Sequence, residues 1–180
     1  NIGVLTGFAI SANEGEIDIT GQGGGLAGTS QNDGIRIGGT IASTGLGADA
    51  ARITLLGTGG AGLSSNYGVR ISSTISSIDG DISITGTGQG TGMDCVGVRT
   101  ARINSTGTGA NAADITITGF GSTLAMGDGN SGVIIATPNT FNTVDGDIAI
   151  NGTGGGGPLT NGNLGIDVSS GVGNGINSTG

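Results

Sequence analysis

The residues best suited to chemistry in this sequence are three pairs of acidic side chains, each pair separated by a single glycine. The pairs are Glu14 and Glu16, Asp79 and Asp81, and Asp145 and Asp147. Ca²⁺ takes roughly 6–8 oxygen ligands, including backbone carbonyls, and needs neither His nor Cys. The pairs therefore predict a Ca²⁺ site at these six residues. The alternative is a set of solvated turns, since Asp-Gly is good turn chemistry without any ligand.

Composition excludes several other kinds of site. The 180 residues contain no His and one Cys, and all five basic residues are Arg. Without His there is no Ser-His-Asp relay or His zinc site, and without Lys there is no Walker A loop or Schiff base. A net charge of −8 argues against nucleic acid as a partner. No apolar run approaches the roughly 18 residues that a membrane span needs.

An internal repeat places these side chains. A segment of alternating apolar residues ending in Gly occurs five times, as in Ile82-Ser83-Ile84-Thr85-Gly86. It is followed by an Asn-x-Gly-(Val/Ile) unit and then by a unit with one apolar residue before Ser, Thr or Asn. The order never changes, the units recur about every 33 residues, and no helical period is present.

Three short strands per repeat are typical of a right-handed parallel β-solenoid. We expect residues 1–180 to form one all-β segment of five full turns and one partial turn, with β-branched residues stacked inside. The expected inward columns are Ile17, Ile53, Ile82, Ile115 and Ile148; Ile19, Leu55, Ile84, Ile117 and Ile150; Val4, Ile35, Val69, Val98, Val133 and Ile166; and Ile10, Ile41, Ile75, Ile103, Phe141 and Ile176.

The corner before the longest strand alternates between short and long. The acidic pairs form the short corners, and the long, Ala-rich corners are 45–52 and 107–114. The structural repeat is therefore predicted to be two turns. Because the chain starts at Asn1 rather than Met, we expect a processed product or an internal piece. The residues 177–180 match 104–107 before a long corner, so a longer chain is expected to continue with one.

Asparagine recurs at the start of each Asn-x-Gly unit, except where Cys95 replaces it. The Asn residues of this column are Asn1, Asn32, Asn66, Asn130 and Asn163. Asn tolerates left-handed backbone, and stacked amides can hydrogen-bond from turn to turn. We therefore expect a structural ladder in which Cys95 is a buried thiol without a disulfide partner.

Two outward columns offer binding surfaces. Arg36, Arg70 and Arg99 on successive turns could hold a carboxylate-bearing sugar or an acid of a neighbouring chain; the alternative is a solvated face paired with nearby Asp. Outward Thr residues form a partial Thr-x-Thr array that would suit ice binding. The array is interrupted by Asp18, Leu56, Ala149 and Asn151.

The repeat resembles one known class of protein. The residues that carry this resemblance are Gly-Asp-Ile-Ser-Ile-Thr-Gly-Thr-Gly at 80–88, the Asn-x-Gly-Val unit, and Ser-Thr-Ile-Ser-Ser at 73–77. This pattern is similar to the β-strand repeats of very large bacterial surface proteins, namely filamentous-haemagglutinin-like adhesins and autotransporter passengers. The resemblance covers the whole chain by repeat pattern only. It implies export to the cell surface or extracellular space, and it identifies no ligand.

We therefore expect a non-enzymatic extracellular structural protein that forms a fibre, sheath or adhesin stalk. Its expected partners are copies of itself, head to tail along the axis and side by side, and it requires no cofactor apart from the candidate Ca²⁺. The alternative is a β-helix that binds or cleaves polysaccharide, and ice binding is a minor alternative. An active site should break the repeat, whereas these acids follow it, and the longest irregular stretch, 136–140, carries none.

Overall fold

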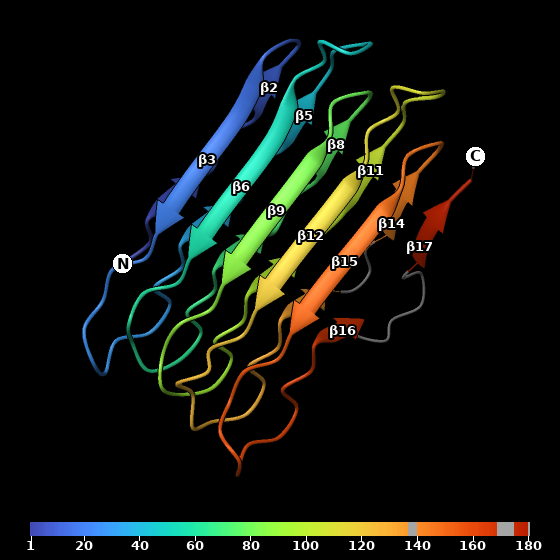
Figure 1. The fold of residues 1–180 in the computed structure, drawn as a ribbon. Helices are drawn as coiled ribbons and strands as arrows, with labels where there is room; N and C mark the ends of the chain where they lie inside the picture. The colour runs from blue at the N-terminus through green and yellow to red at the C-terminus, as the bar shows by residue number, and fades with distance from the viewer. Residues whose placement is uncertain (137–139, 169–174, 180) are drawn as a thin grey trace.

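The chain winds as a β-solenoid of about five turns, with about 33 residues in each turn (Figure 1). This computed structural model describes residues 1–136, 140–168 and 175–179, so Gly180 and most of the irregular stretch 136–140 lie outside it. Within the described ranges the chain forms no helix, and hence none long and apolar enough to cross a membrane. The predicted all-β parallel solenoid with three strands per turn is confirmed.

Equivalent strands of successive turns form three parallel sheets, named here sheets A, B and C. Sheet A contains β1 (Val4–Thr6), β4 (Ile35–Ile37), β7 (Val69–Ile71), β10 (Val98–Thr100), β13 (Val133–Ile135) and β16 (Ile166–Val168). Sheet B contains β2 (Ile10–Ala12), β5 (Ile41–Ser43), β8 (Ile75–Ser77), β11 (Ile103–Ser105), β14 (Thr140–Thr143) and β17 (Gly175–Ser178). Sheet C contains the longest strands, β3 (Glu16–Gln22), β6 (Arg52–Thr58), β9 (Ile82–Thr87), β12 (Ile115–Phe120) and β15 (Ile148–Thr153).

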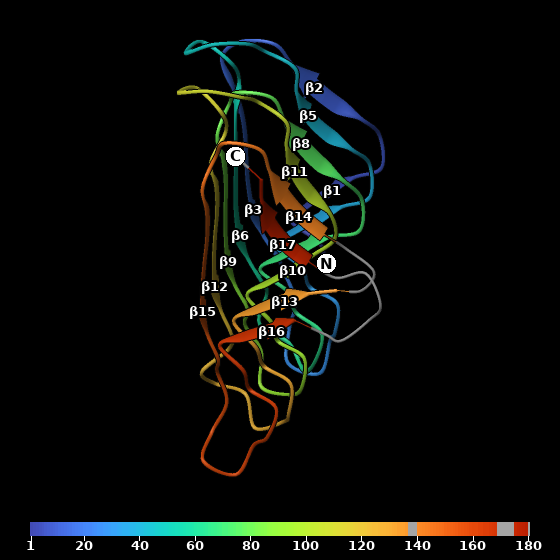
Figure 2. The same cartoon turned by 90° about the vertical axis from the view of Figure 1, so that its right-hand side faces the viewer.

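The strands pair without a shift in register, so residues of the same role lie on top of one another. Ile84 pairs with Leu55 on one side and with Ile117 on the other. These side chains point into the space between sheet C, which forms one long side in Figure 2, and sheets A and B opposite. The predicted inward residues of the middle turns are fully buried. One apolar column per strand face is therefore enough to build a continuous core.

The outermost turns keep the register but not the burial. In the last turn Ile166, Val168 and Ile176 are 41, 46 and 47% exposed, although Val133 and Phe141 beneath them are fully buried. In the first turn Val4 and Ile10 are only partly buried. The expected burial of Ile166 and Ile176 is therefore wrong in this structure, because no described residue lies above them.

Sheets C and A meet through backbone rather than through side chains. A Cβ atom on Gly86 would lie 2.2 Å from the carbonyl oxygen of Gly97, and the same contact repeats in every full turn. The facing pairs are Gly21 and Gly34, Gly57 and Gly68, Gly86 and Gly97, Gly119 and Gly132, and Gly152 and Gly165. The glycine that ends each alternating segment is therefore required by a close approach of two chains.

Candidate functional site

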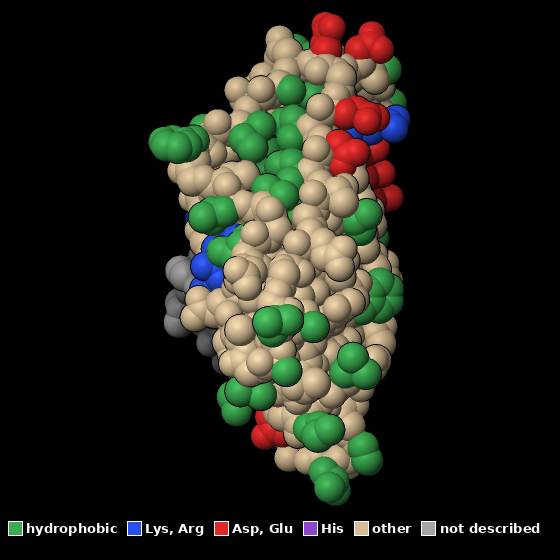
Figure 3. Space-filling view, turned by 90° about the vertical axis from the view of Figure 1, so that its left-hand side faces the viewer, with side chains coloured by type: hydrophobic (Ala, Val, Ile, Leu, Met, Phe, Trp, Pro, Cys, Tyr) green, Lys and Arg blue, Asp and Glu red, His purple; other side chains and the backbone are tan. Residues whose placement is uncertain are grey.

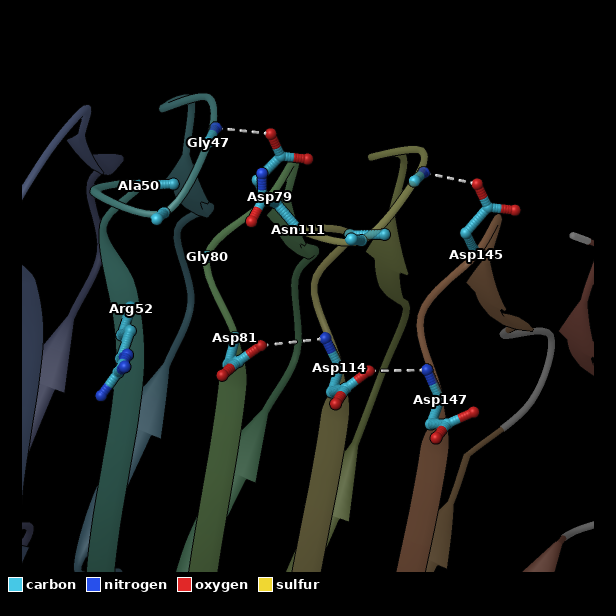
Figure 4. Close-up of a pocket in the computed structure, with 14 residues that line it drawn as sticks. Gly47, Ala50, Arg52, Asp79, Gly80, Asp81, Asn111, Asp114, Asp145 and Asp147 are labelled. Atoms are coloured by element: carbon cyan, nitrogen blue, oxygen red, sulfur yellow. Dashed lines mark hydrogen bonds between the residues drawn. The ribbon is translucent and has the colours of Figure 1, made fainter.

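The acidic side chains gather along the edge where sheet B passes into sheet C (Figure 4). Here the two long corners enclose a groove of about 410 Å³. Its charged lining residues are Asp79, Asp81, Asp114, Asp145, Asp147 and Arg52. Four of the six predicted ligands thus share one groove, while Glu14 and Glu16 lie beside Asp49 at a neighbouring hollow.

The short corners are closed by hydroxyl groups from sheet B. Ser77 donates a hydrogen bond to the carbonyl oxygen of Gly80, and Thr143 donates to that of Gly146 at 2.6 Å. The corner glycine then packs directly on the turn below, since a Cβ on Gly80 would lie 1.9 Å from the Ala51 carbonyl oxygen. Small residues at Gly80 and Ala51 therefore allow a short corner to lie on a long one.

The first acid of each of two short corners supports the long corner of the preceding turn. Asp79 Oδ2 accepts a hydrogen bond from the Gly47 N–H at 2.7 Å, and Asp145 Oδ2 accepts one from the Gly109 N–H at 2.6 Å (Figure 4). Gly47 and Gly109 have φ values of 78° and 79°, which favour glycine. Each of these long corners is thus held by an acid of the turn above it, in line with the predicted two-turn alternation.

The second acids are linked to one another along the axis. Asp81 Oδ1 accepts from the Asp114 N–H at 3.1 Å, and Asp114 Oδ1 accepts from the Asp147 N–H at 2.7 Å. Asp114 was not among the six predicted ligands, although it precedes its strand as Asp81 and Asp147 precede theirs. That shared position was the signal that could have included it.

These contacts give the carboxylates a structural task without a ligand. Among the residues that the structure describes, no three His, Cys, Asp or Glu side chains are grouped closely enough to hold a metal ion. The predicted Ca²⁺ site at the three acidic pairs stays a prediction. If Ca²⁺ binds there, a chelator will lower the melting temperature, and the combined Asp79→Asn and Asp81→Asn change will abolish that effect.

The hydrogen bond to Gly47 makes a separate prediction for Asp79. Asp79→Ala should lower the free energy of unfolding by about 1 kcal/mol, because the Gly47 N–H loses its acceptor. Asp79→Asn keeps an acceptor oxygen and should retain most of the stability. Thermal melts in chelator, followed by circular dichroism, check both. Equal losses for the two variants would contradict an acceptor role and indicate that the charge itself matters.

The predicted asparagine ladder is present. Asn32 Nδ2 donates to Asn66 Oδ1 at 2.9 Å, and Asn130 Nδ2 donates to Asn163 Oδ1 at 3.2 Å. The left-handed backbone expected at these positions lies one residue earlier instead. Gln31, Ser65 and Asp94 have φ values of 60°, 57° and 57°, which turn the chain so that the following side chain points inward.

Cys95 occupies the ladder position of its turn and is fully buried, as predicted. Its thiol lies 3.9 Å from Asn66 Nδ2, and sulfur is a weak acceptor. Burial raises the pKa of Cys95 above its ordinary value, and hydrogen bonds from Asn66 offset only part of that effect. The thiol is therefore protonated at neutral pH and is placed for packing rather than for nucleophilic chemistry.

Cys95→Asn should complete the ladder. The new amide oxygen would accept from Asn66 Nδ2, while the backbone N–H of residue 95 already donates to Asn130 Oδ1 at 2.9 Å. We expect the free energy of unfolding to rise by about 1 kcal/mol in urea titrations. Cys95→Ser removes the thiol without supplying an amide, so it is the control. An Asn variant no more stable than the Ser variant would contradict the prediction.

The arginine column lies on the outer face of sheet A, with Arg70 in register with both Arg36 and Arg99. Arg36 Nε donates to the buried carboxylate of Asp33 at 2.7 Å, and the Arg70 guanidinium lies 5.3 Å from the centre of the Tyr67 ring. The pairing with a nearby Asp is thus confirmed for Arg36. Burial raises the pKa of Tyr67, followed by the charge of Asp94, so its hydroxyl is neutral.

The outer face of sheet C carries the partial Thr array. Thr85 and Thr118 are neighbours, but Leu56 and Asn151 flank them in the same column. Asp18 and Ala149 end the column of Thr54 and Thr116. The predicted interruptions are therefore confirmed, and the array is two or three turns deep.

No protein family, curated protein or solved structure matched this chain when it was compared with known proteins.

Proposed function

We propose that the protein is a structural element extended along its solenoid axis, as part of an extracellular fibre, sheath or adhesin stalk. The observation that supports this most is the exposure of inward apolar residues in the last turn. Ile166, Val168 and Ile176 are 41–47% exposed, and the equivalent side chains of the middle turns are buried. A further turn above them would bury these side chains as Val133 and Phe141 are buried.

The backbone supports the same proposal. Each sheet ends in a strand whose outer N–H and C=O groups face away from the stack, and such edges pair readily with another strand. In the first turn Phe8 is 88% exposed and Val4 is only partly buried, so that side also presents apolar surface. The next turn can come from the same polypeptide or from a second copy. Head-to-tail contact between copies along the solenoid axis produces a filament when its rotation does not close into a ring.

The acidic groove supports a structural rather than an enzymatic role. Asp79, Asp81, Asp114 and Asp145 each accept a backbone hydrogen bond from an adjacent corner or turn. Their positions follow the repeat, whereas hydrolysis of a glycosidic bond by a carboxylate pair needs two carboxylates with different environments at one place.

Electron microscopy and fibre diffraction test the proposal. We expect elongated particles with an axial spacing of about 4.8 Å, the distance between paired strands. Ile166→Lys places a charge on the inward side of the last described turn and should shorten or abolish the fibres. Asp167→Lys, on the outward side of the same strand, is the matched control and should leave them intact. Monomers at all concentrations, unaffected by either variant, would refute axial extension by docking of copies.

The arginine column favours a second candidate function, the binding of an anionic polysaccharide. Three guanidinium groups in adjacent register present repeated donors along the axis, which suits a polymer with regularly spaced carboxylates. Titration calorimetry with polygalacturonate tests it. Binding that Arg70→Gln and Arg99→Gln together abolish would support this function, and no heat of binding would exclude that polymer.

A further inference from the structure

The arginine column concentrates positive charge on the outer face of sheet A. Arg36, Arg70 and Arg99 lie next to one another in register on three successive turns. The residues in register with the two ends of the column are Leu5 and Ile134, so no acid of the same face lies beside it. Like charges opposite one another on paired strands repel. Three adjacent guanidinium groups therefore require a counter-charge from elsewhere.

Most acids of the chain lie too far away to supply that charge. Eight of the thirteen acidic residues line the hollows along the sheet B to sheet C edge, where the basic lining residue is Arg52. Figure 3 shows most acidic side chains toward one end of the molecule, with a basic group beside them, and further basic side chains on the opposite edge. The counter-charge for the arginine column therefore has to come from nearby loop residues or from a ligand.

Two of the three arginines are held by the residue three positions before them, the variable residue of the Asn-x-Gly unit. The fully buried Asp33 accepts a hydrogen bond from Arg36 Nε at 2.7 Å. The Arg70 guanidinium lies over the Tyr67 ring, 5.3 Å from its centre, as a cation–π contact. In the third turn this position is Val96, a buried apolar residue that cannot hold a guanidinium. The first two arginines are thus the pre-positioned pair of the column.

The same two arginines carry hydrogen-bond donors without an acceptor. Arg36 Nη2 and Arg70 Nε are buried, and neither has a hydrogen-bond partner among the residues that the structure describes. An unpaired buried donor in a folded protein commonly indicates a bound water or ion. The two residues are paired across adjacent strands, so their side chains start about 4.8 Å apart on one face. One small oxyanion between them can accept hydrogen bonds from both guanidinium groups.

The balance of charge at this pair indicates a monovalent anion. Asp33 compensates one of the two guanidinium charges, which leaves the other for a ligand. Burial and then the charge of Asp94 raise the pKa of Tyr67, so a second acid lies close to Arg70. A divalent anion would be repelled by these acids more strongly than a monovalent one. The carboxylates of uronic acids and the sulfate esters of sugars are monovalent oxyanions that polysaccharides carry.

We propose that Arg36 and Arg70 form a subsite that holds one monovalent oxyanion of an acidic polysaccharide between two turns of the solenoid. Asp33 and Tyr67 are its positioning residues, and Arg99 contributes little because no residue of its turn holds it. This inference rests on the proposed binding of an anionic polysaccharide, and it names the pair of residues and the chemical group that they recognise.

Titration with galacturonate, a single sugar with one carboxylate, tests the subsite. The chain contains one Tyr and no Trp, so its intrinsic fluorescence reports on Tyr67 beside Arg70. We expect a saturable change with galacturonate and none with galactose, which lacks the charge. Galactose 6-sulfate identifies the anion, because the sugar that binds more tightly carries the recognised group. The absence of a saturable change with both charged sugars would overturn the subsite.

The arginine side chains give a second measurement of the same binding. The chain has five Arg residues, so the Nε–H region of a ¹⁵N NMR spectrum contains five signals, which single Arg→Gln variants assign. Galacturonate should shift the signals of Arg36 and Arg70, while Arg52 in the acidic groove is the internal control. Equal shifts of all five signals would overturn the proposal in favour of unspecific binding.

Matched variants separate the subsite from the column as a whole. Arg36→Gln and Arg70→Gln should each raise the dissociation constant of galacturonate at least about tenfold, because each removes a charge-assisted donor. Arg99→Gln, in the same column, should change it by less than about twofold. Arg70→Lys keeps the charge without the planar fork and should also weaken binding. Equal effects of the three Gln variants, all folded by circular dichroism, would overturn the assignment to the first two arginines.

Tyr67 is tested as a positioning residue by NMR titration, since its replacement removes the fluorescence. Tyr67→Phe keeps the aromatic ring and should retain galacturonate binding, whereas Tyr67→Leu should weaken it. Equal binding by the two variants would show that the ring does not position Arg70, and would overturn that part of the proposal.

The polymer distinguishes failure of the subsite from failure of the proposed polysaccharide binding. Polygalacturonate that binds Arg36→Gln as tightly as the wild type, without binding of galacturonate, would overturn the subsite and leave the polysaccharide function. Binding of galacturonate without binding of polygalacturonate would support the subsite and exclude that polymer. Sedimentation velocity tests a protein ligand instead. A dimer that galacturonate dissociates would assign the subsite to an acidic side chain of a second copy and overturn its polysaccharide ligand.

Discussion

Replacing Ile84 with Asp is expected to prevent the middle of the solenoid from folding. Ile84 is fully buried and lies between Leu55 and Ile117 of the neighbouring turns. No described basic side chain lies in this core cluster, so the carboxylate would be charged without a partner. The cost of an unpaired buried charge is several kcal/mol, and the whole stability of a domain is roughly 5–15 kcal/mol. Circular dichroism and urea titration measure the loss.

Two matched variants separate burial from charge and from position. Thr85→Asp puts the same carboxylate one residue further on, on the outer face of sheet C, and should change the stability by less than about 0.5 kcal/mol. Ile19→Asp makes the change in the outermost turn of the same column, where the side chain is only partly buried, and should unfold fewer turns, because stability in a stack is summed over neighbours. Cooperative unfolding of Ile84→Asp at the wild-type midpoint would show that this column is not the core.

The inward apolar columns could be predicted because every turn places equivalent residues in the same environment. The alternation of Ile with polar residues fixes which face of a strand is inward, and the recurring glycines fix where a strand ends. Five repetitions then leave one consistent alignment, which the register of sheet C reproduces residue by residue.

The contacts between corners could not be predicted in the same way. The hydrogen bond from Gly47 to Asp79 joins residues that are 32 positions apart, and neither residue type alone indicates the other. The sequence predicts the alternation of corners and leaves the acids open as Ca²⁺ ligands or as solvated turns. It does not show that backbone N–H groups of the turn below lie within hydrogen-bond distance of the Asp79 and Asp145 carboxylates.

The repeating glycines could be located in the sequence, but the contacts that require them could not be predicted. In the sequence, Gly86 ends an alternating segment and Gly97 is the glycine of an Asn-x-Gly-(Val/Ile) unit, the one in which Cys95 replaces Asn. At that level the two glycines indicate only where strands begin and end. The reason why glycine is required is seen only in the folded turn, where Gly86 lies against the backbone of Gly97 and against the side chain of Val98. An invariant glycine in a repeat indicates a close approach, but the partner is set by the fold.

Gly86→Ala is accordingly expected to be among the most damaging small substitutions in this chain. The new Cβ would lie 2.2 Å from the Gly97 carbonyl oxygen and 2.7 Å from the Val98 Cγ2 atom. Backbone atoms held by two sheet ladders cannot rotate away as a flexible side chain can, so the sheets must separate. We expect a loss of about 3 kcal/mol or more in the free energy of unfolding. Urea titration measures it, with Gly7→Ala, which has no heavy atom within 4 Å of its Cβ, as the tolerated control.

A double substitution tests whether the damage comes from this contact. Gly97→Ala also inserts a Cβ between sheets C and A, 2.3 Å from the Phe120 nitrogen and 2.6 Å from the Gly132 carbonyl oxygen of the next turn. If one added methyl group already forces sheets C and A apart, part of the space for the second methyl group is already created. The loss in Gly86→Ala with Gly97→Ala should therefore be smaller than the two single losses added together. Strictly additive losses in the free energy of unfolding would mean that each glycine is required by the local backbone conformation of its own turn. The close approach of the two sheets would then not be the cause of the damage.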